Sequence, residues 1–280
     1  MYGPRILPTA VLLTVSAFCL LAFHGPRRVH AALENEARHD IDTMLTNERS
    51  ASQHRSEYAY VSHERSDRTG GHLWTEKVVE TPVGKIRFLL DEDGHPLPPE
   101  RAAEERGRLA RYAADPATLA KASQGMKDDE AHALQLLEMV PRAFVFSNLR
   151  QQGGDIHIDF APDPNYAPQS MEERVLHNMV GSVVIDERTM RLHHIEGRLP
   201  QDVSLGFGLL ATIRAGSEFA STRNPIDPPE WKTALISTNV NGHALFFKTI
   251  SRKEQAVHAE FQRVPNDISV PQAVALAEQP

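Results

Sequence analysis

The sequence predicts a mainly β (α+β) fold, a curved antiparallel half-barrel sheet of about nine or ten strands covered by two or three helices. Three observations predict it. After Glu57, apolar side chains recur at every second position, which is typical of strands. Glycine-rich and Asn-Gly turns separate these segments, which favours hairpins between neighbouring strands. Two stretches with helical spacing interrupt the strands, and one has an apolar side that can pack on a sheet.

The first 31 residues have the features of a secretory signal peptide. Arg5 gives a positive start, and an apolar run follows over residues 6–23. Val29-His30-Ala31 then precedes the predicted cleavage site between Ala31 and Ala32. An uncleaved membrane anchor is the alternative, because a run of 18 residues just spans a bilayer. The signal predicts a periplasmic or secreted protein.

Cysteine content and charge exclude several classes of function. Cys19 is the only cysteine, and it follows Phe18 rather than the small residue that a lipoprotein signal requires. Cleavage would remove it with Arg5, Arg27 and Arg28 and no acidic residue, so the formal charge would change from −7 to −10. A mature chain without cysteine forms no disulfide. Because its acidity attracts neither nucleic acid nor anionic lipid, we expect no nucleic-acid partner and membrane contact only through an uncleaved signal segment.

Residues 32–56 predict an N-terminal helix or a tether, and the sheet domain is placed at residues 57–267. Strands are expected at 58–62, 72–81, 85–90, 142–149, 156–160, 181–186, 190–199, 205–219, 231–240 and 243–251. The clearest hairpin has Asn241-Gly242 at its turn, the favoured pair for a two-residue type I′ turn. This turn would place Val240 opposite His243.

A helical insertion is expected over residues 98–140. Proline before Glu100 predicts the start of a charged helix over 100–113, and a second helix should run from about residue 128 to Val140. That second helix is expected to pack on the sheet because three of its residues share one side: Leu134, Leu137 and Val140.

Two shorter helical segments are predicted after the insertion. Ser170-Met171-Glu172-Glu173 fits a capping box and predicts a helix to about Met179. Residues 268–280 predict a C-terminal tail or short helix.

The sequence indicates no catalytic residue, no metal site and no cofactor. Asp155, His157 and Asp159 alternate along one strand and could bind a divalent metal, but a solvated strand face explains them as well, because apolar residues form the opposite face. The Gly-x-Ser-x-Gly pattern of a serine hydrolase is missing. Gly206-Phe207-Gly208 lacks the third glycine of a dinucleotide loop and predicts a strand bulge or bend.

Five blocks of sequence are distinctive together: Asp93-Gly94-His95-Pro96-Leu97, residues 157–164, residues 181–186, Ile195-Glu196-Gly197-Arg198-Leu199 and residues 240–247. They resemble an uncharacterised family of exported envelope proteins from soil bacteria, over most of residues 55–265. That family is similar in element order to the periplasmic carriers of outer-membrane lipoproteins, the LolA/LolB-like fold. Such carriers have a curved, unclosed barrel covered by helices, with an apolar cavity for acyl chains. No functional residue transfers one by one.

The resemblance implies a non-enzymatic periplasmic binding or carrier module for a lipid or a lipidated protein. The residues expected to line its apolar cavity are Leu134, Leu137, Val140, Ile236, Leu245 and Phe247. A filled core is the alternative to a cavity. Two other functions stay open, an envelope protein–protein interaction or sensor domain and an unrecognised hydrolase. An apolar cavity on the order of several hundred Å³ would favour the carrier, an exposed apolar patch the interaction domain, and a Ser or Asp bonded to a His in a cleft the hydrolase.

Overall fold

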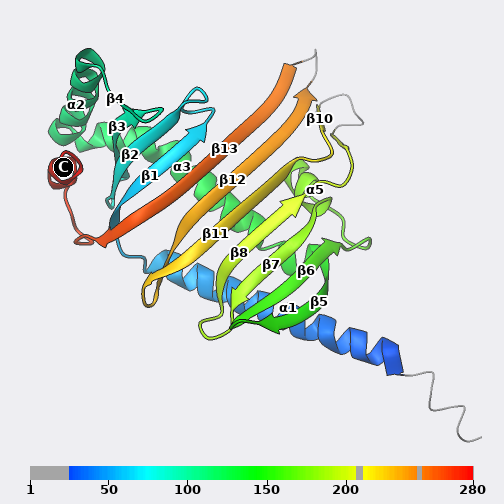
Figure 1. The fold of residues 1–280 in the computed structure, drawn as a ribbon. Helices are drawn as coiled ribbons and strands as arrows, with labels where there is room; N and C mark the ends of the chain where they lie inside the picture. Colours follow the sequence, from blue (N-terminus) through cyan, green and yellow to red (C-terminus); the bar gives the residue numbers. More distant parts are fainter. Residues whose placement is uncertain (1–24, 206–210, 245–247, 280) are drawn as a thin grey trace, which may run out of the picture.

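A computed structural model describes residues 25–205, 211–244 and 248–279, which form a large antiparallel sheet of 13 strands and six helices (Figure 1). The strands lie side by side in the order β4-β3-β2-β1-β13-β12-β11-β8-β7-β6-β5, and β10 extends the sheet beside β12 and β9. Most neighbours are consecutive hairpin strands, and the pairing of β1 with β13 joins the two ends of the domain. The sheet stays open, because β4 and β5 form its two separate edges.

The strands are β1 (Tyr58–Ser66), β2 (Leu73–Glu80), β3 (Lys85–Glu92), β4 (His95–Pro96), β5 (Phe144–Gln152), β6 (Asp155–Pro162), β7 (Val180–Asp186), β8 (Arg191–Arg198), β9 (Val203–Leu205), β10 (Ala211–Ile213), β11 (Glu218–Asp227), β12 (Glu230–Ala244) and β13 (Lys248–Arg263). The helices are α1 (Gly25–Gln53), α2 (Pro99–Ala114), α3 (Pro116–Leu137), α4 (Val140–Ala143), α5 (Met171–His177) and α6 (Val270–Ala277).

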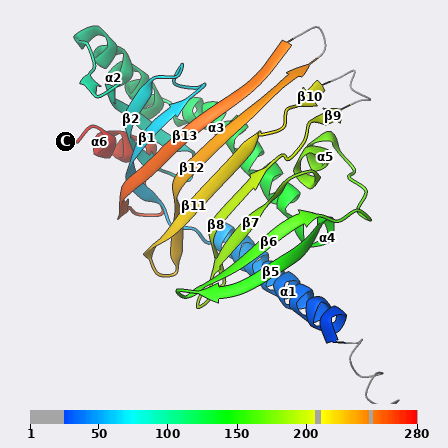
Figure 2. The same cartoon turned by 45° about the vertical axis from the view of Figure 1, so that its right-hand side comes forward.

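Alternation along the strands gives the sheet two faces. We call inner the face that carries Val183 and Ile236, and outer the face that carries Ser182 and Leu235; the strand register connects these positions across the sheet. Helices α1, α3 and α5 lie on the inner face, behind the strands in Figures 1 and 2. Helices α2 and α6 pack instead at the β1–β3 end of the outer face, on Ala59, Val79 and Ile86.

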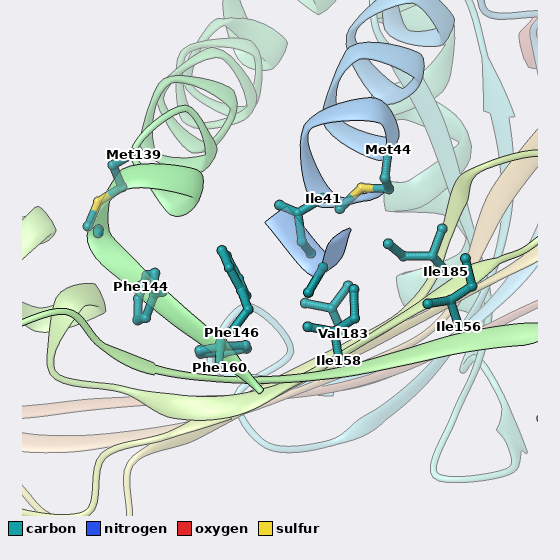
Figure 3. Packing of buried hydrophobic residues seen from close by; sticks show 12 residues of the cluster. Ile41, Met44, Met139, Phe144, Phe146, Ile156, Ile158, Phe160, Val183 and Ile185 are labelled. Atoms are coloured by element: carbon teal, nitrogen blue, oxygen red, sulfur yellow. The ribbon is translucent and has the colours of Figure 1, made fainter. Parts of the chain in front are cut away.

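Helix α1 buries its apolar side on the inner face of β5–β8. Ala37 and Ile41 are fully buried and Met44 almost so. Figure 3 shows this cluster, in which Ile41 and Met44 of α1 face Ile156, Ile158, Val183 and Ile185 of the sheet. Glu48 also ties α1 to the sheet through ion pairs: its carboxylate binds Arg191 of β8 at 2.7 Å and contacts the guanidinium of Arg223 of β11.

The predicted Asn241-Gly242 turn is wrong. Both residues lie inside β12, which continues to Ala244, and Val240 pairs with Arg252 rather than with His243. Gly242 serves a close approach between strands, because a Cβ there would lie 2.5 Å from the carbonyl oxygen of Thr212 on β10. The pairing of β12 with β10 therefore outweighs the preference of the Asn-Gly dipeptide for a turn.

Most of the other predicted elements are found with shifted bounds. The segment 205–219, expected to form one or two strands, instead contains β10 and the ends of β9 and β11, and β11 continues to Asp227. Strand β13 runs to Arg263, well beyond the predicted end at residue 251. The charged helix is α2, and the helix expected from about residue 128 starts earlier, as α3 at Pro116. Ser170 caps α5 by accepting a hydrogen bond from the Glu173 backbone, and the C-terminal segment forms α6. The sheet exceeds the expected strand number because it includes β4, β9 and β10, which have only two or three residues each.

The N-terminal predictions are only partly covered by the described residues. Helix α1 begins at Gly25, so the predicted cleavage site between Ala31 and Ala32 lies within its first two turns. Most of the predicted signal segment, and the glycines at 206 and 208, lie outside the described residues. In the part of the chain that the structure covers, no helix has the length and apolar character needed to cross a bilayer.

Candidate functional site

A strip of apolar side chains on the inner face of β11 and β12 stays accessible to solvent. Phe219, Ala234, Ile236 and Val240 are only partly buried. We call these four residues the inner strip. Phe219 and Val240 also pack against the apolar cluster around Leu199, Val203 and Leu205. Helix α3 runs across the same face behind β13, β12 and β11 (Figures 1 and 2). Apolar groups that are covered by a helix yet reached by water are suited to a hydrophobic ligand.

Helix α3 is anchored near its two ends. At the first end, Leu119 belongs to the apolar cluster at the β1–β3 end of the sheet, and Ser123 lies against the β2–β3 turn. Just beyond the second end, Met139 and Val140 pack into the cluster under α1. Among the residues that the structure describes, no hydrogen bond joins α3 to β11, β12 or β13.

The residues predicted to line a cavity fall in two places. Leu137 and Val140 are half-buried at the end of α3 and the start of α4, and Val140 packs against the α1 cluster. Ile236 lies in the inner strip. The side chain of Leu134, and the whole of Leu245 and Phe247, lie outside the described residues. Val240 and Ile236 lie on the same face of β12, as predicted. They are four residues apart, and every second residue of a strand points to the same face.

A buried ionic cluster occupies the inner face of β1–β3. The Arg68 guanidinium binds the carboxylates of Glu64 and Glu76, each through two contacts of 2.6 and 3.1 Å, and Arg87 donates to Glu76 at 2.9 Å. Burial opposes the ionisation of Glu64, but hydrogen bonds from Arg68 and Ser66 hold its pKa below the ordinary value. Two carboxylates and two guanidinium groups neutralise one another here, so this cluster is a structural network with no charge left for a ligand.

Beside this network, two lysines share one carboxylate. The Nζ atom of Lys232 lies 2.7 Å from Glu80, and that of Lys85 lies 3.5 Å from it. The backbone N–H of Tyr58 also donates to Glu80 at 3.1 Å. Burial opposes the ionisation of Glu80, yet Lys85 and Lys232 hold its pKa below the ordinary value. One positive charge of this trio therefore has no negative partner within it.

A small pocket of about 190 Å³ opens next to these lysines. It lies at the β2–β3 turn, where α3 begins its path across the sheet. Its charged lining comprises Arg55, Glu57, Glu80, Lys85, Arg87 and Lys127. We call it the basic pocket, because Arg87 is already paired with Glu76 and the remaining lining has three basic side chains for two carboxylates.

A larger groove of about 720 Å³ crosses the outer face of β5–β8 and β11. Its polar side chains largely satisfy each other: Asn148 donates to Asp159 at 2.9 Å and Ser182 to Glu196 at 3.2 Å. Acidic and basic groups are mixed along it, and the backbone of Gly181 forms part of its lining. This groove does not offer the apolar surface that a lipid needs, and its three acidic and two basic side chains give no excess of positive charge.

Two histidines bind a carboxylate, His72 with Asp93 at 2.7 Å and His193 with Asp155 at 3.1 Å, but neither pair lines the outer groove or the basic pocket. No histidine lines the outer groove or the basic pocket. Ser62 and His258 face each other on β1 and β13, but the Ser62 hydroxyl has no hydrogen-bond partner and Nδ1 of His258 is 3.0 Å from the Thr233 carbonyl oxygen. Asp155, His157 and Asp159 share the outer face as predicted, and no group of metal-binding side chains is found within the described ranges.

The charged groups of the inner face were missed by sequence reasoning. Their signal was the spacing: Tyr60, Ser62 and Glu64 follow one another at every second position, so all three belong to one face. That pattern could not tell which face is buried, because the answer depends on where α3 and the β2–β3 hairpin lie.

Models of protein families, curated proteins and solved structures were each compared with the chain, and none of the three comparisons finds a match. The function therefore has to be argued from the two faces of the sheet and the groups that they carry.

Proposed function

We propose that the chain is a non-enzymatic binding or carrier module, which holds the acyl part of a lipid or of a lipidated protein between α3 and the inner face of the sheet. The observation that carries this proposal is the inner strip, whose apolar side chains stay partly exposed on the face of the sheet that α3 crosses. Each methylene group buried there would contribute about 0.8 kcal/mol, so a chain of moderate length could bind without any catalytic group.

The anchoring of α3 supports a ligand that enters and leaves. A carrier must open its site, and a helix that is anchored by apolar clusters near its two ends can move away from the sheet between them. Such a movement of α3 leaves the sheet intact, because β12 and β13 are held by strand pairing that does not involve α3. We further propose that the module works in the bacterial envelope, which the N-terminal segment predicts.

The proposal is tested by native mass spectrometry of the full chain purified from a bacterial periplasm. Co-purified lipid, released by organic solvent and identified by its mass, is the expected result. A fluorescent fatty acid should then bind to the delipidated protein at one site per chain. A bare monomer that also fails to bind the fluorescent fatty acid would overturn the carrier function.

One observation favours a second function, an envelope protein–protein interaction. Leu235 and Val257 lie directly opposite each other on β12 and β13, and on the outer face they are 40% and 45% exposed. A cross-strand pair of exposed apolar side chains beside a polar groove is a feature of protein interaction surfaces. Because the two candidate functions use opposite faces of the same strand, substitutions on β12 separate them.

A further inference from the structure

We propose that the ligand of the inner face is an anionic amphiphile, whose phosphate or carboxylate group binds in the basic pocket while its hydrocarbon chain lies under α3. This inference rests on the proposed function, because it adds a head-group site to the same binding face. Its evidence is separate, since it comes from charge and position rather than from the inner strip.

The position of the basic pocket fits a head group. The pocket lies at the end of the sheet where α3 starts its crossing, and Lys127 of α3 contributes to its wall. Lys85 and Arg87 of β3 point to the inner face, the face that also carries Ile236. The close seating of α3 depends on Gly84, where a Cβ would lie 2.1 Å from the Ser123 hydroxyl oxygen. A chain that runs from the pocket under α3 therefore stays on one face throughout.

The size of the basic pocket also fits. Its volume of about 190 Å³ corresponds to about six water molecules, at roughly 30 Å³ each. A phosphate or carboxylate group with its nearest atoms occupies a comparable space, whereas an acyl chain does not fit entirely. The pocket can thus hold the charged end of the ligand and leaves the chain to the inner strip.

The charges of the basic pocket call for an anion. Burial opposes the charge of Lys85, but Tyr60 and Glu80 outweigh it and raise the pKa of this lysine, so it stays positive. Lys127 is exposed at the rim and its Nζ contacts only the Pro82 carbonyl oxygen, at 3.5 Å, within the described residues. Lys85, Lys127 and Lys232 therefore share two carboxylates, those of Glu57 and Glu80, and a bound anion would balance the formal excess of positive charge.

A neighbouring histidine reports the same positive potential. The pKa of His258 is lowered, first by burial and then by the charges of Lys85 and Arg87. The outer groove shows no such bias, because its arginines alternate with acidic side chains. Compared with the outer groove, the basic pocket combines an excess of positive charge with a place on the inner face.

The test is isothermal titration calorimetry of the delipidated full chain with dodecyl phosphate, dodecyl glucoside and inorganic phosphate, each amphiphile below its critical micelle concentration. We expect dodecyl phosphate to bind about tenfold more tightly than dodecyl glucoside, because charge-assisted hydrogen bonds add to the same hydrocarbon contacts. Inorganic phosphate alone should bind more weakly than dodecyl phosphate.

Matched variants locate the head group. Lys85→Gln should lower the affinity for dodecyl phosphate about tenfold and Lys127→Gln about threefold, and neither should change the affinity for dodecyl glucoside. Lys121→Gln removes the same charge from an exposed position of α3 that does not line the basic pocket, and should change nothing. Lys85→Arg keeps the charge and should retain most of the affinity, and circular dichroism checks that each variant is folded.

Each other outcome contradicts a different claim. Equal affinities for the two amphiphiles, or no effect of Lys85→Gln, would overturn the head-group site and leave the proposed function standing. Inorganic phosphate that binds as tightly as dodecyl phosphate would overturn the amphiphile and point to a free anion. If neither amphiphile binds, the proposed function itself is overturned.

Discussion

Arg68 and Glu76 form a two-point ion pair on the inner face, with N–O distances of 2.6 and 3.1 Å. Glu76 is almost fully buried, so in Arg68→Met the Glu76 carboxylate would be paired with Arg87 alone. Breaking a buried pair costs roughly 3–5 kcal/mol, and because Arg68 is 40% exposed and Arg87 remains, we expect a loss of about 2 kcal/mol in the free energy of unfolding. Urea unfolding followed by circular dichroism measures it. Arg49→Met, which breaks an exposed pair with Glu138, should cost less than about 1 kcal/mol; equal losses would contradict the role of Arg68.

The buried carboxylates predict that the protein loses stability in acid. The pKa of Glu64 lies below its ordinary value of 4.5, because Arg68 and Ser66 outweigh the burial that opposes ionisation. A carboxyl group with a lowered folded pKa contributes stability above its unfolded pKa, and that contribution disappears as the pH falls through the folded pKa. Glu48 and Glu80 act in the same direction. The free energy of unfolding should therefore decrease as the pH falls below about 4.5.

The variant Glu64→Gln isolates one part of this acid sensitivity. It should be less stable than the wild type at pH 7 and should depend less steeply on pH between about 5 and 2. Glu104→Gln, at a side chain that is 69% exposed, is the control and should keep the wild-type slope. Urea denaturation at a series of pH values gives both slopes, and a Glu64→Gln slope as steep as that of the wild type would refute the assignment.

Much of the sheet could be predicted from the sequence because its hairpins are local. Gly153 and Gly154 both adopt positive φ, as the turn between β5 and β6 requires, and short-range pairing then fixes β5 and β6. Asn241-Gly242 shows the limit of this reasoning. The same dipeptide preference exists there, but the partner that decides the outcome is Thr212, about thirty residues earlier, and no local pattern reveals it.

The candidate site was less predictable than the fold, because it depends on which elements cover which face. Ile236 lies on a strand, as predicted. The basic pocket was not predicted, because its wall combines Lys85 of β3, Lys127 of α3 and Arg55 after α1. These three residues are unremarkable surface charges in the sequence. Only the path of α3 across the β2–β3 turn brings them together, and that path is a result of tertiary packing.

The close approach at Gly242 predicts a strong effect of a small substitution. Gly242→Ala would place a methyl group 2.5 Å from the Thr212 carbonyl oxygen and 3.2 Å from Ile213, so β10 must shift. We expect a loss of about 1–3 kcal/mol in the free energy of unfolding. Gly125→Ala in α3 is the matched control, because a Cβ at this position meets no atom within 4 Å. This substitution should raise the free energy of unfolding by about 0.5–1 kcal/mol through the higher helix propensity of alanine. Chemical unfolding of both variants checks this, and a neutral Gly242→Ala would show that the strands are not so close.

Cleavage of the predicted signal after Ala31 should leave the fold intact. Among residues 32–53 of α1, whose burial is described, the first buried one is Ala37, and the contacts of Ile41 and Met44 lie beyond the cleavage site. A chain of residues 32–280 should therefore unfold with the free energy of the full chain to within about 0.5 kcal/mol. Removing residues up to 45 should destabilise it by several kcal/mol, since the α1 cluster would lose its helix.

The cleavage itself can be read from the exported protein. Intact-mass measurement of periplasmic protein should give a chain that begins at Ala32. A chain that keeps its first residues and fractionates with membranes would contradict cleavage and support the anchor instead.

Neighbouring residues of β12 separate the two candidate functions. Ile236 lies in the inner strip and Leu235 is exposed on the outer face, so the same substitution at each position affects one face only. Ile236→Glu should abolish binding of a fluorescent fatty acid, because the ligand would have to bury a carboxylate beside its chain. Leu235→Glu should leave this binding within about twofold of the wild type, since it adds the same charge outside the strip. If Leu235→Glu abolishes the interaction of the protein with an envelope partner in a crosslinking assay while Ile236→Glu does not, the outer face is the functional one and the carrier role is contradicted.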